Sequence, residues 1–207
     1  VRGPNAFLVD SGLEANAPRL DADLRAAGID PERLRALVLT HGHADHAGGA
    51  SYFRQKYGTT IVAGRGDADL LATGHNDRLC PTNGDAEDRL ASDQAATYAP
   101  FQADVLVDEE LPLEPLTGIP GRVVPLPGHT AGSLVVSLGN AVFVGDLFRG
   151  AIVGSSAETH FYMCDLAGNR RDIRSLVERI APAAVTFFTG HFGPVDRRAV
   201  VARFLSP

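Results

Sequence analysis

The residues with the clearest chemical character form one short run, His41-Gly42-His43-Ala44-Asp45-His46. Its three imidazoles and one carboxylate offer nitrogen and oxygen donors that suit a borderline divalent ion such as zinc. The run follows an apolar segment at 36–40 that predicts a buried strand, and it precedes a pattern that predicts a helix over 49–57. A turn at this place, with small residues between the donors, lets the side chains converge. The run therefore predicts a metal-binding turn.

Three further candidate ligands follow apolar segments that predict strands. His129 comes directly after Leu126-Pro127-Gly128, Asp146 after the segment 141–145, and His191 after Phe187-Phe188-Thr189-Gly190. The glycine before each one allows the backbone to turn and to approach a neighbour closely. A single histidine at a strand end is more often a surface or capping residue. Four strand ends that each offer a donor instead indicate one shared metal centre.

The elements that must position these residues are short strands and helices. Gly139-Asn140 between two apolar runs is a two-residue hairpin signal. Elsewhere helical patterns separate the strands, and this mixture favours a layered sheet protein with helices outside. We expect strands over 6–9, 59–63, 104–107, 123–126, 133–138, 141–145 and 184–189, and helices over 20–27, 67–72, 172–181 and 196–204.

The stretch 73–100, called the flap below, has a weaker pattern. It is polar and contains Pro81, Asn83 and Gly84, followed by a helical pattern near 86–96. Because lids are drawn from segments of low stability, we expect the flap to border the active cleft and to move more than the sheets. A solvated surface excursion is the alternative interpretation.

Composition limits the class of protein. The chain has 207 residues, of which 44% are hydrophobic and 21% charged, which predicts one folded domain over 1–207 and excludes disordered and coiled-coil classes. The net charge of -6 gives no signature of nucleic-acid binding, and no apolar run is long enough to span a membrane. Cys80 and Cys164 lie outside any ligand motif and are expected to be ordinary thiols in a reducing compartment. We therefore expect the bacterial cytoplasm, with a signal peptide removed ahead of Val1 as the alternative.

Taken together, the donor residues and their surroundings resemble the metallo-β-lactamase-fold hydrolase superfamily. The resemblance implies an α/β (α+β) fold, a four-layer αββα sandwich with the metals in a cleft at one edge of two sheets. The family usually has additional strands ahead of the first matching one, so we expect a trimmed N-terminus. The matching stretches occur in the family's order: 8–12, 39–49, 127–133, 143–146 and 190–194.

The resemblance also implies a role for each donor. Two zinc ions are expected, with iron or manganese as alternatives, and they would lower the pKa of a bridging water to supply hydroxide. Asp45 would bind metal and also orient that nucleophile or accept its proton. The implied assignments are His41, His43 and His129 for the first ion, Asp45, His46 and His191 for the second, Asp146 as the bridge, and Asp10 as a buried aspartate that binds no metal.

Asp146 also discriminates between branches of the family. Dedicated β-lactamases of this fold usually carry cysteine or serine there, whereas a carboxylate is typical of glyoxalase II-type thioesterases, lactonases and nucleases. Only about sixteen residues follow His191, so we expect no helical substrate domain of the glyoxalase II kind. The acidic balance disfavours a phosphate-rich polymer. A small ester, thioester or lactone is the expected substrate, with no nucleic-acid or membrane partner.

Candidate substrate-binding residues lie near the ligands in sequence. Arg149, His160 and Tyr162 are the main candidates, and His75 and Phe192 are further ones. Three other functions stay open: β-lactamase activity, a non-catalytic scaffold, and a persulfide dioxygenase. The last would hold a single iron with His41, His129 and Asp146, which is the arrangement of two histidines and one carboxylate that suits non-haem iron.

Overall fold

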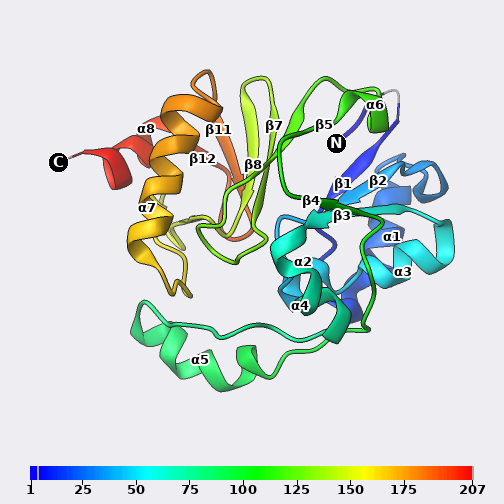
Figure 1. Cartoon of the computed structure of the whole chain (residues 1–207), viewed down its shortest axis with the longest axis horizontal. Helices are drawn as coiled ribbons and strands as arrows, with labels where there is room; N and C mark the ends of the chain where they lie inside the picture. The colour runs from blue at the N-terminus through cyan, green and yellow to red at the C-terminus, as the bar shows by residue number, and fades with distance from the viewer. Residues whose placement is uncertain (4, 207) are drawn as a thin grey trace.

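Two β-sheets pack face to face at the centre of the fold, with helices on both outer faces (Figure 1). The structure, a computed structural model, describes residues 1–3 and 5–206. No helix in this described part is long and apolar enough to cross a membrane. The observed layers are those of the αββα sandwich that the sequence predicts.

The first sheet is parallel and has the order β1-β2-β3-β4. The second sheet has the order β12-β11-β8-β7-β6-β5 and is antiparallel except for the pair β11 and β8. A separate hairpin joins β9 and β10. The bounds are β1 Phe7–Val9, β2 Ala36–Val38, β3 Thr60–Gly64, β4 Val105–Val107, β5 Leu111–Pro112, β6 Arg122–Pro125, β7 Leu134–Leu138, β8 Ala141–Gly145, β9 Arg149–Gly150, β10 Ala157–Glu158, β11 Thr186–Thr189 and β12 Val195–Asp196.

Helices make the crossovers that parallel strands require. The bounds of the α-helices are α1 Ala17–Ala26, α2 Ala44–Ala47, α3 Ala50–Tyr57, α4 Ala68–Thr73, α5 Gly84–Gln94, α6 Glu114–Thr117, α7 Leu166–Ser175 and α8 Arg197–Val200. Short 3₁₀ turns cover Glu14–Asn16, Pro31–Arg33 and Arg65–Asp67, and π-helical turns extend α7 over Leu176–Ile180 and α8 over Val201–Leu205.

Alternation along the strands divides the core into layers. In β2, Val38 faces the second sheet and packs with Val136, whereas its neighbour Leu37 faces the helical layer and packs with Leu71. On the far side of the second sheet, Val142 packs in the same cluster as Ile173 of α7. Each sheet is therefore buried on both faces, which explains the nearly continuous apolar runs of its strands.

Helix α7 begins earlier than the sequence predicts. The pattern predicts a helix over 172–181, but the helix starts at Leu166. The preceding residue, Asp165, caps it by accepting a hydrogen bond from Gly168 N. The helical residues before position 172 include an exposed leucine, a glycine and two arginines, so they form no apolar stripe for a periodicity search to find. A side-chain cap, and not hydrophobic burial, sets this boundary.

The two cysteines are not ordinary thiols. Cys80 of the flap and Cys164, just before α7, form a disulfide, so the sequence-based expectation is wrong. Eighty-four positions separate them, and the sequence carries no local signal for such a pairing. The two cysteines therefore give no support for a reducing compartment, because disulfides persist in oxidising environments.

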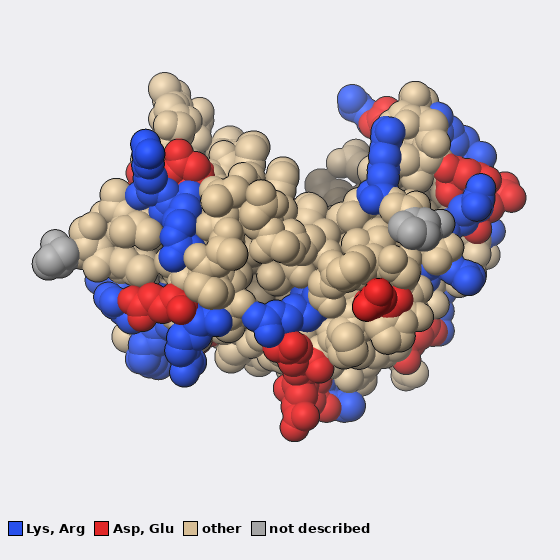
Figure 2. All heavy atoms as spheres, turned by 90° about the horizontal axis from the view of Figure 1, so that it is seen from above, with Lys and Arg blue, Asp and Glu red and all other residues tan. Residues whose placement is uncertain are grey.

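Charge on the surface is mixed. On the face turned away from the flap, Lys and Arg side chains lie next to Asp and Glu rather than forming one basic surface (Figure 2).

Candidate metal centre

The turn after β2 carries the largest group of donors. His41, His43 and His46 are buried, at 2%, 5% and 3% exposure, although histidine is often more exposed. Side chains from elsewhere in the fold hold the backbone of this turn. Gly42 N donates to Asp67 Oδ2 over 2.8 Å, and Ala44 N donates to Asn76 Oδ1 of the flap over 2.8 Å. The turn is thus fixed from outside before any ion is considered.

The other donors lie just after strand ends at the same edge of the sandwich. His129 follows β6, Asp146 follows β8 and His191 follows β11. Gly145 has a φ of +52°, a conformation that favours glycine. A Cβ at Gly190 would collide with the Asp146 carboxylate and the His46 ring. These glycines allow the strand ends to approach as closely as the ligands require.

The donors form two main groups. Within each group the donor atoms lie within 4.8 Å of one another. A third group shares two members with these and adds one more histidine. The groups are His41, His43 and His129; Asp45, His46, Asp146 and His191; and His129, Asp146 and His160.

Asp146 lies between the two main groups. Its Oδ1 is 3.2 Å from His46 Nε2, and its Oδ2 is 3.9 Å from His41 Nε2 and 4.0 Å from His129 Nε2. The side chain is 3% exposed. Oδ2 is also 3.4 Å from His191 Nε2 of the second group, so one buried carboxylate lies between the donors of both groups.

The donor set fits a metal. Buried polar atoms without partners cost about 1–3 kcal/mol each, so a fold retains them only where something else satisfies them. Among the described residues, His41 Nε2, His46 Nε2 and Asp146 Oδ1 are buried without an aligned hydrogen-bond partner. All three point into the same cluster of nitrogen and oxygen donors, which is the chemistry that divalent ions such as zinc use.

Electrostatics keep His41, Asp45 and Asp146 in their binding forms, whereas nearby carboxylates outweigh burial and raise the pKa of His46 and of His191, whose protons an ion would displace. Burial, together with the neighbouring imidazoles, holds the pKa of His41 well below its usual value. Burial alone would raise the pKa of Asp146, but His160, His46 and His191 hold it well below its usual range. For Asp45, contacts with His191 and His46 outweigh burial and lower the pKa to about 2. Neutral imidazole and ionised carboxylate are the forms that bind metal.

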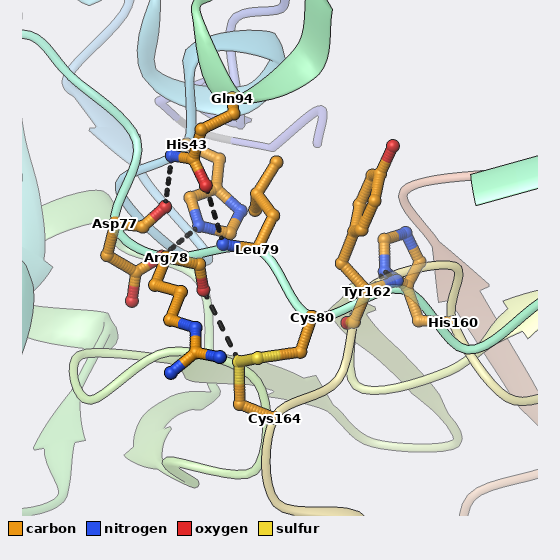
Figure 3. Close-up of a disulfide and its surroundings, with 9 residues drawn as sticks. All are labelled: His43, Asp77, Arg78, Leu79, Cys80, Gln94, His160, Tyr162 and Cys164. Atoms are coloured by element: carbon orange, nitrogen blue, oxygen red, sulfur yellow. Dashed lines mark hydrogen bonds and ion pairs between the residues drawn. A yellow bond between two sulfur atoms is a disulfide. The ribbon is translucent and has the colours of Figure 1, made fainter. Parts of the chain in front are cut away.

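Hydrogen bonds to the outer ring nitrogens orient two of the candidate ligands. His46 Nδ1 lies 2.8 Å from Asp10 Oδ2, and Asp10 also accepts hydrogen bonds from Thr40. Asp10 itself belongs to none of the donor groups. On the other side of the site, His43 Nε2 lies 2.7 Å from Asp77 Oδ1 (Figure 3). Each contact leaves the opposite ring nitrogen free for an ion.

Sequence analysis did not identify Asp77. It lies in the flap, 34 positions after His43, and no motif surrounds it. Its acidic type within a polar stretch that follows a ligand motif was the only available signal.

A cavity of about 380 Å³ opens over the donors. It contacts His43, Asp146 and His191, so it reaches donors of both main groups. A second cavity, of about 570 Å³, contacts the site only through Asp45, His46 and His191. We take the first as the substrate cavity for this reason. Its other lining residues are Leu13, Ala44, Asp45, Asn76, Leu79, Arg89, Asp93, Ala96, His160, Phe161, Tyr162 and Phe192.

The candidate substrate-binding residues divide between the cavity and its surroundings. His160, Tyr162 and Phe192 line the cavity. Arg149 does not line it: its guanidinium stacks over the Phe161 ring, 4.2 Å from the centroid, and donates to a backbone carbonyl. His75 is exposed and likewise lies outside the cavity lining.

Comparisons with known proteins agree with this geometry. The chain is 26% identical over 185 residues to the probable metallo-hydrolase YybB of Bacillus subtilis, covering 88% of this chain and 74% of that protein. It is 30% identical over 144 residues to a hydroxyacylglutathione hydrolase of Anaeromyxobacter dehalogenans, covering 70% of this chain but only 42% of that protein. A hydroxyacylglutathione hydrolase GloC of Haemophilus influenzae is 29% identical over 151 residues, covering 72% of this chain and 64% of that protein.

Solved structures and family profiles give the same assignment. A metallo-β-lactamase from Cronobacter sakazakii matches with a TM-score of 0.59 and 21% identity, covering 92% of this chain and 69% of that one, which shows a common fold. The profile of the metallo-β-lactamase superfamily matches residues 2–191, a range that includes every donor residue described above. This chain belongs to the metallo-β-lactamase superfamily of metal-dependent hydrolases.

Proposed function

We propose that this protein is a dinuclear zinc hydrolase that cleaves a small ester, thioester or lactone. The observation that carries the proposal is the position of Asp146, whose carboxylate oxygens lie 3.2–4.0 Å from donor nitrogens of both main groups. A carboxylate in this position can bind one ion with each oxygen. It also offsets the repulsion between two dications, which lie about 3.5–4 Å apart in two-metal sites.

When bound, two such ions supply a water of lowered pKa and polarise the scissile carbonyl. The chain contributes the rest of the chemistry. Asp45 lines the substrate cavity, and its Oδ2 lies 3.2 Å from His191 Nε2. This contact aims the carboxylate so that it can accept a proton from the attacking water. Because no serine or cysteine among the described residues lines the cavity, attack by water is the simplest route.

The size and lining of the cavity favour a small substrate. Its volume of about 380 Å³ lies at the lower end of the range for small-molecule sites. Phe161, Tyr162 and Phe192 supply apolar surface, and Arg89 supplies one positive charge. Two of the relatives are named hydroxyacylglutathione hydrolases, which favours a thioester over the other two substrate classes.

The test is a substrate panel assayed with protein of known metal content. Purified protein is loaded with zinc, its metal content is measured, and it is offered thioesters, lactones, carboxylic esters, β-lactams and phosphodiesters. We expect two zinc ions per chain and the highest kcat/KM on a member of the first three classes.

Other results would overturn the proposal. Turnover restricted to β-lactams or phosphodiesters would contradict the substrate class. A single bound iron, with oxygen consumed in the presence of a persulfide, would replace hydrolysis by dioxygenase chemistry. Absence of turnover with both ions bound would favour a scaffold.

A further inference from the structure

We propose that His160 is an eighth protein ligand of the metal centre, in addition to the seven donors of the two main groups. The proposal rests on the proposed function only in requiring a divalent ion in the site. It does not depend on which substrate is cleaved.

The position of His160 matches that of the assigned ligands. The side chain is buried, and Nε2 lies 2.8 Å from Asp146 Oδ2. The ring centroid is 5.0 Å from that of His129 and 5.3 Å from that of His191. The short distance to Asp146 is not an aligned hydrogen bond, because Nε2 has no hydrogen-bond partner of good geometry among the described residues. Nε2 of His41 and Nε2 of His46 are likewise buried without a hydrogen-bond partner among the described residues.

The outer nitrogen of the ring has the contact that a metal-binding histidine usually makes. His160 Nδ1 lies 3.3 Å from the carbonyl oxygen of Tyr162. Histidine ligands commonly donate their second N–H to such a carbonyl, which leaves the other nitrogen with a free lone pair. Tyr162 N lies at the same distance and would favour the opposite tautomer. A cation at Nε2 selects the first arrangement.

The loop that carries His160 is tied to the flap at His160 itself and at the residues that follow it. Thr82 Oγ1 donates to the His160 carbonyl over 2.8 Å, and Met163 N donates to the Cys80 carbonyl over 2.8 Å. The disulfide between Cys80 and Cys164 closes the same contact covalently (Figure 3). These ties lie outside the ligand cluster, so the ring stays aimed at the donors without relying on contacts to them.

The donor groups indicate which ion His160 would bind. It groups with His129 and Asp146, and His129 is also a donor of the first group. His160 would therefore join the ion of the first group. That ion would have protein donors from His41, His43, His129, Asp146 and His160, more than the three of a typical catalytic zinc site.

A direct test is through-bond coupling in the cadmium-substituted protein. The chain is labelled with nitrogen-15 in histidine, loaded with cadmium-113, and examined by NMR for scalar coupling between metal and ring nitrogens. We expect coupling at His160 Nε2 as well as at the histidines of the two main groups. The exposed His75 is the internal control and should show none. Coupling at the other ligands without coupling at His160 would overturn the proposal.

A pair of variants gives an independent readout. His160→Gln should lower the affinity for one of two cadmium ions by at least about tenfold, the loss that even an outer partner of a ligand causes. His75→Gln is the matched control and should leave both affinities unchanged. Equal affinities in His160→Gln and the unmodified protein would contradict ligation.

The outcomes separate this proposal from the proposed function. Coupling at His160 in a protein that hydrolyses no ester, thioester or lactone would remove the function and leave the ligand. Hydrolysis of one of these substrates without coupling at His160 would keep the proposed function and exclude His160 as a ligand. Absence of cadmium coupling at every histidine would remove both.

Discussion

The ligands and the groups that orient them come from two different kinds of structure. The ligands stand at the ends of β2, β6, β8 and β11, at one edge of two buried sheets. The flap, with its helix α5, lies outside that framework (Figure 1), and several of its residues line the substrate cavity. Yet it contacts the ligand turn three times, through Asp77 on His43, through Asn76 on Ala44 N, and through the Tyr98 hydroxyl, which donates to the Gly42 carbonyl.

The strand-end residues would bind the ions, whereas the flap residues would adjust how tightly the ions are bound. Strand ends in a close-packed sandwich have little freedom, so they fix donor positions. The flap is positioned by individual ties to the rest of the chain, among them the disulfide, the hydrogen bond from Tyr162 to Asp93, and the contact between Asp77 and His43. Breaking a tie in the flap should weaken the centre without abolishing it, whereas changing a strand-end ligand should abolish one ion.

The largest effect is expected for the bridge. Asp146→Asn keeps the size of the side chain but removes its charge and one anionic oxygen. We expect loss of one of two ions and a fall in turnover of at least about a hundredfold, comparable to the loss of a key transition-state contact. Metal content and kcat are measured on the same preparation, with circular dichroism as the check on folding. Two tightly held ions and normal turnover in this variant would show that Asp146 does not bridge.

A smaller effect is expected for the flap carboxylate. Asp77→Ala leaves His43 Nε2–H without its acceptor, and we expect zinc affinity to fall about 10–100-fold, as for other partners of ligating histidines. Asp77→Asn keeps one oxygen as an amide carbonyl, so its zinc affinity should lie between that of Asp77→Ala and that of the unmodified chain. Asp69→Asn, an exposed acid of α4, is the control and should bind zinc normally. Normal zinc affinity in Asp77→Ala would mean that the flap does not support the centre.

The disulfide should affect stability more than it affects binding. Replacing Cys80 and Cys164 by serine frees the denatured chain from a long closed loop, and we expect the free energy of unfolding in urea to fall by about 2–4 kcal/mol. Zinc affinity should fall less than in Asp77→Ala, because the hydrogen bonds between flap and loop remain. Faster proteolysis within the flap would locate the change. An unaltered flap in the serine variant would show that the other ties suffice.

The smallest effect on the centre is expected far from it, at Asp21 of α1. Its buried carboxylate contacts Arg25, Tyr52 and Lys56. Burial would raise its pKa, but hydrogen bonds from Lys56 and the tyrosines hold the pKa below its usual value. The unfolded chain therefore binds this proton more readily, so the contribution to stability is present above about pH 4 and falls as the pH is lowered further.

Asp21→Asn should remove that part of the pH dependence. We expect the variant to lose about 1–2 kcal/mol at neutral pH, the scale of a hydrogen bond to a charged group, and to change less between pH 5 and pH 3. Urea unfolding at several pH values measures both effects. Its zinc affinity should equal that of the unmodified chain, and a reduced affinity would show that stability and metal binding are not separable here.

Local signals explain how far the sequence predicts this molecule. The run from His41 to His46 is contiguous, and His129, Asp146 and His191 each follow a glycine at a strand end. Such patterns are readable because strand, turn and donor are adjacent in the chain. The apolar alternation that buries Val38 and Leu37 on opposite faces is local in the same way.

The unpredicted features around the site depend on residues distant in sequence, unlike the start of α7, which a local cap sets. The pairing of Cys80 with Cys164 and the contact of Asp77 with His43 join segments whose own composition is that of a polar loop. His160 was predicted near the substrate, but the donor group that it forms with His129 and Asp146 exists only once three separate segments meet. The spacing of residues along the chain carries no information about such tertiary contacts.

The measurement that tests the two-ion centre most directly is anomalous diffraction at the zinc edge from crystals of the zinc-loaded protein. We predict two peaks about 3.5–4 Å apart, with a different Asp146 oxygen near each one. The ligand distances should be about 2.0–2.2 Å. One peak only, or two peaks with Asp146 bound to neither or to one alone, would contradict the shared carboxylate on which the proposed function rests.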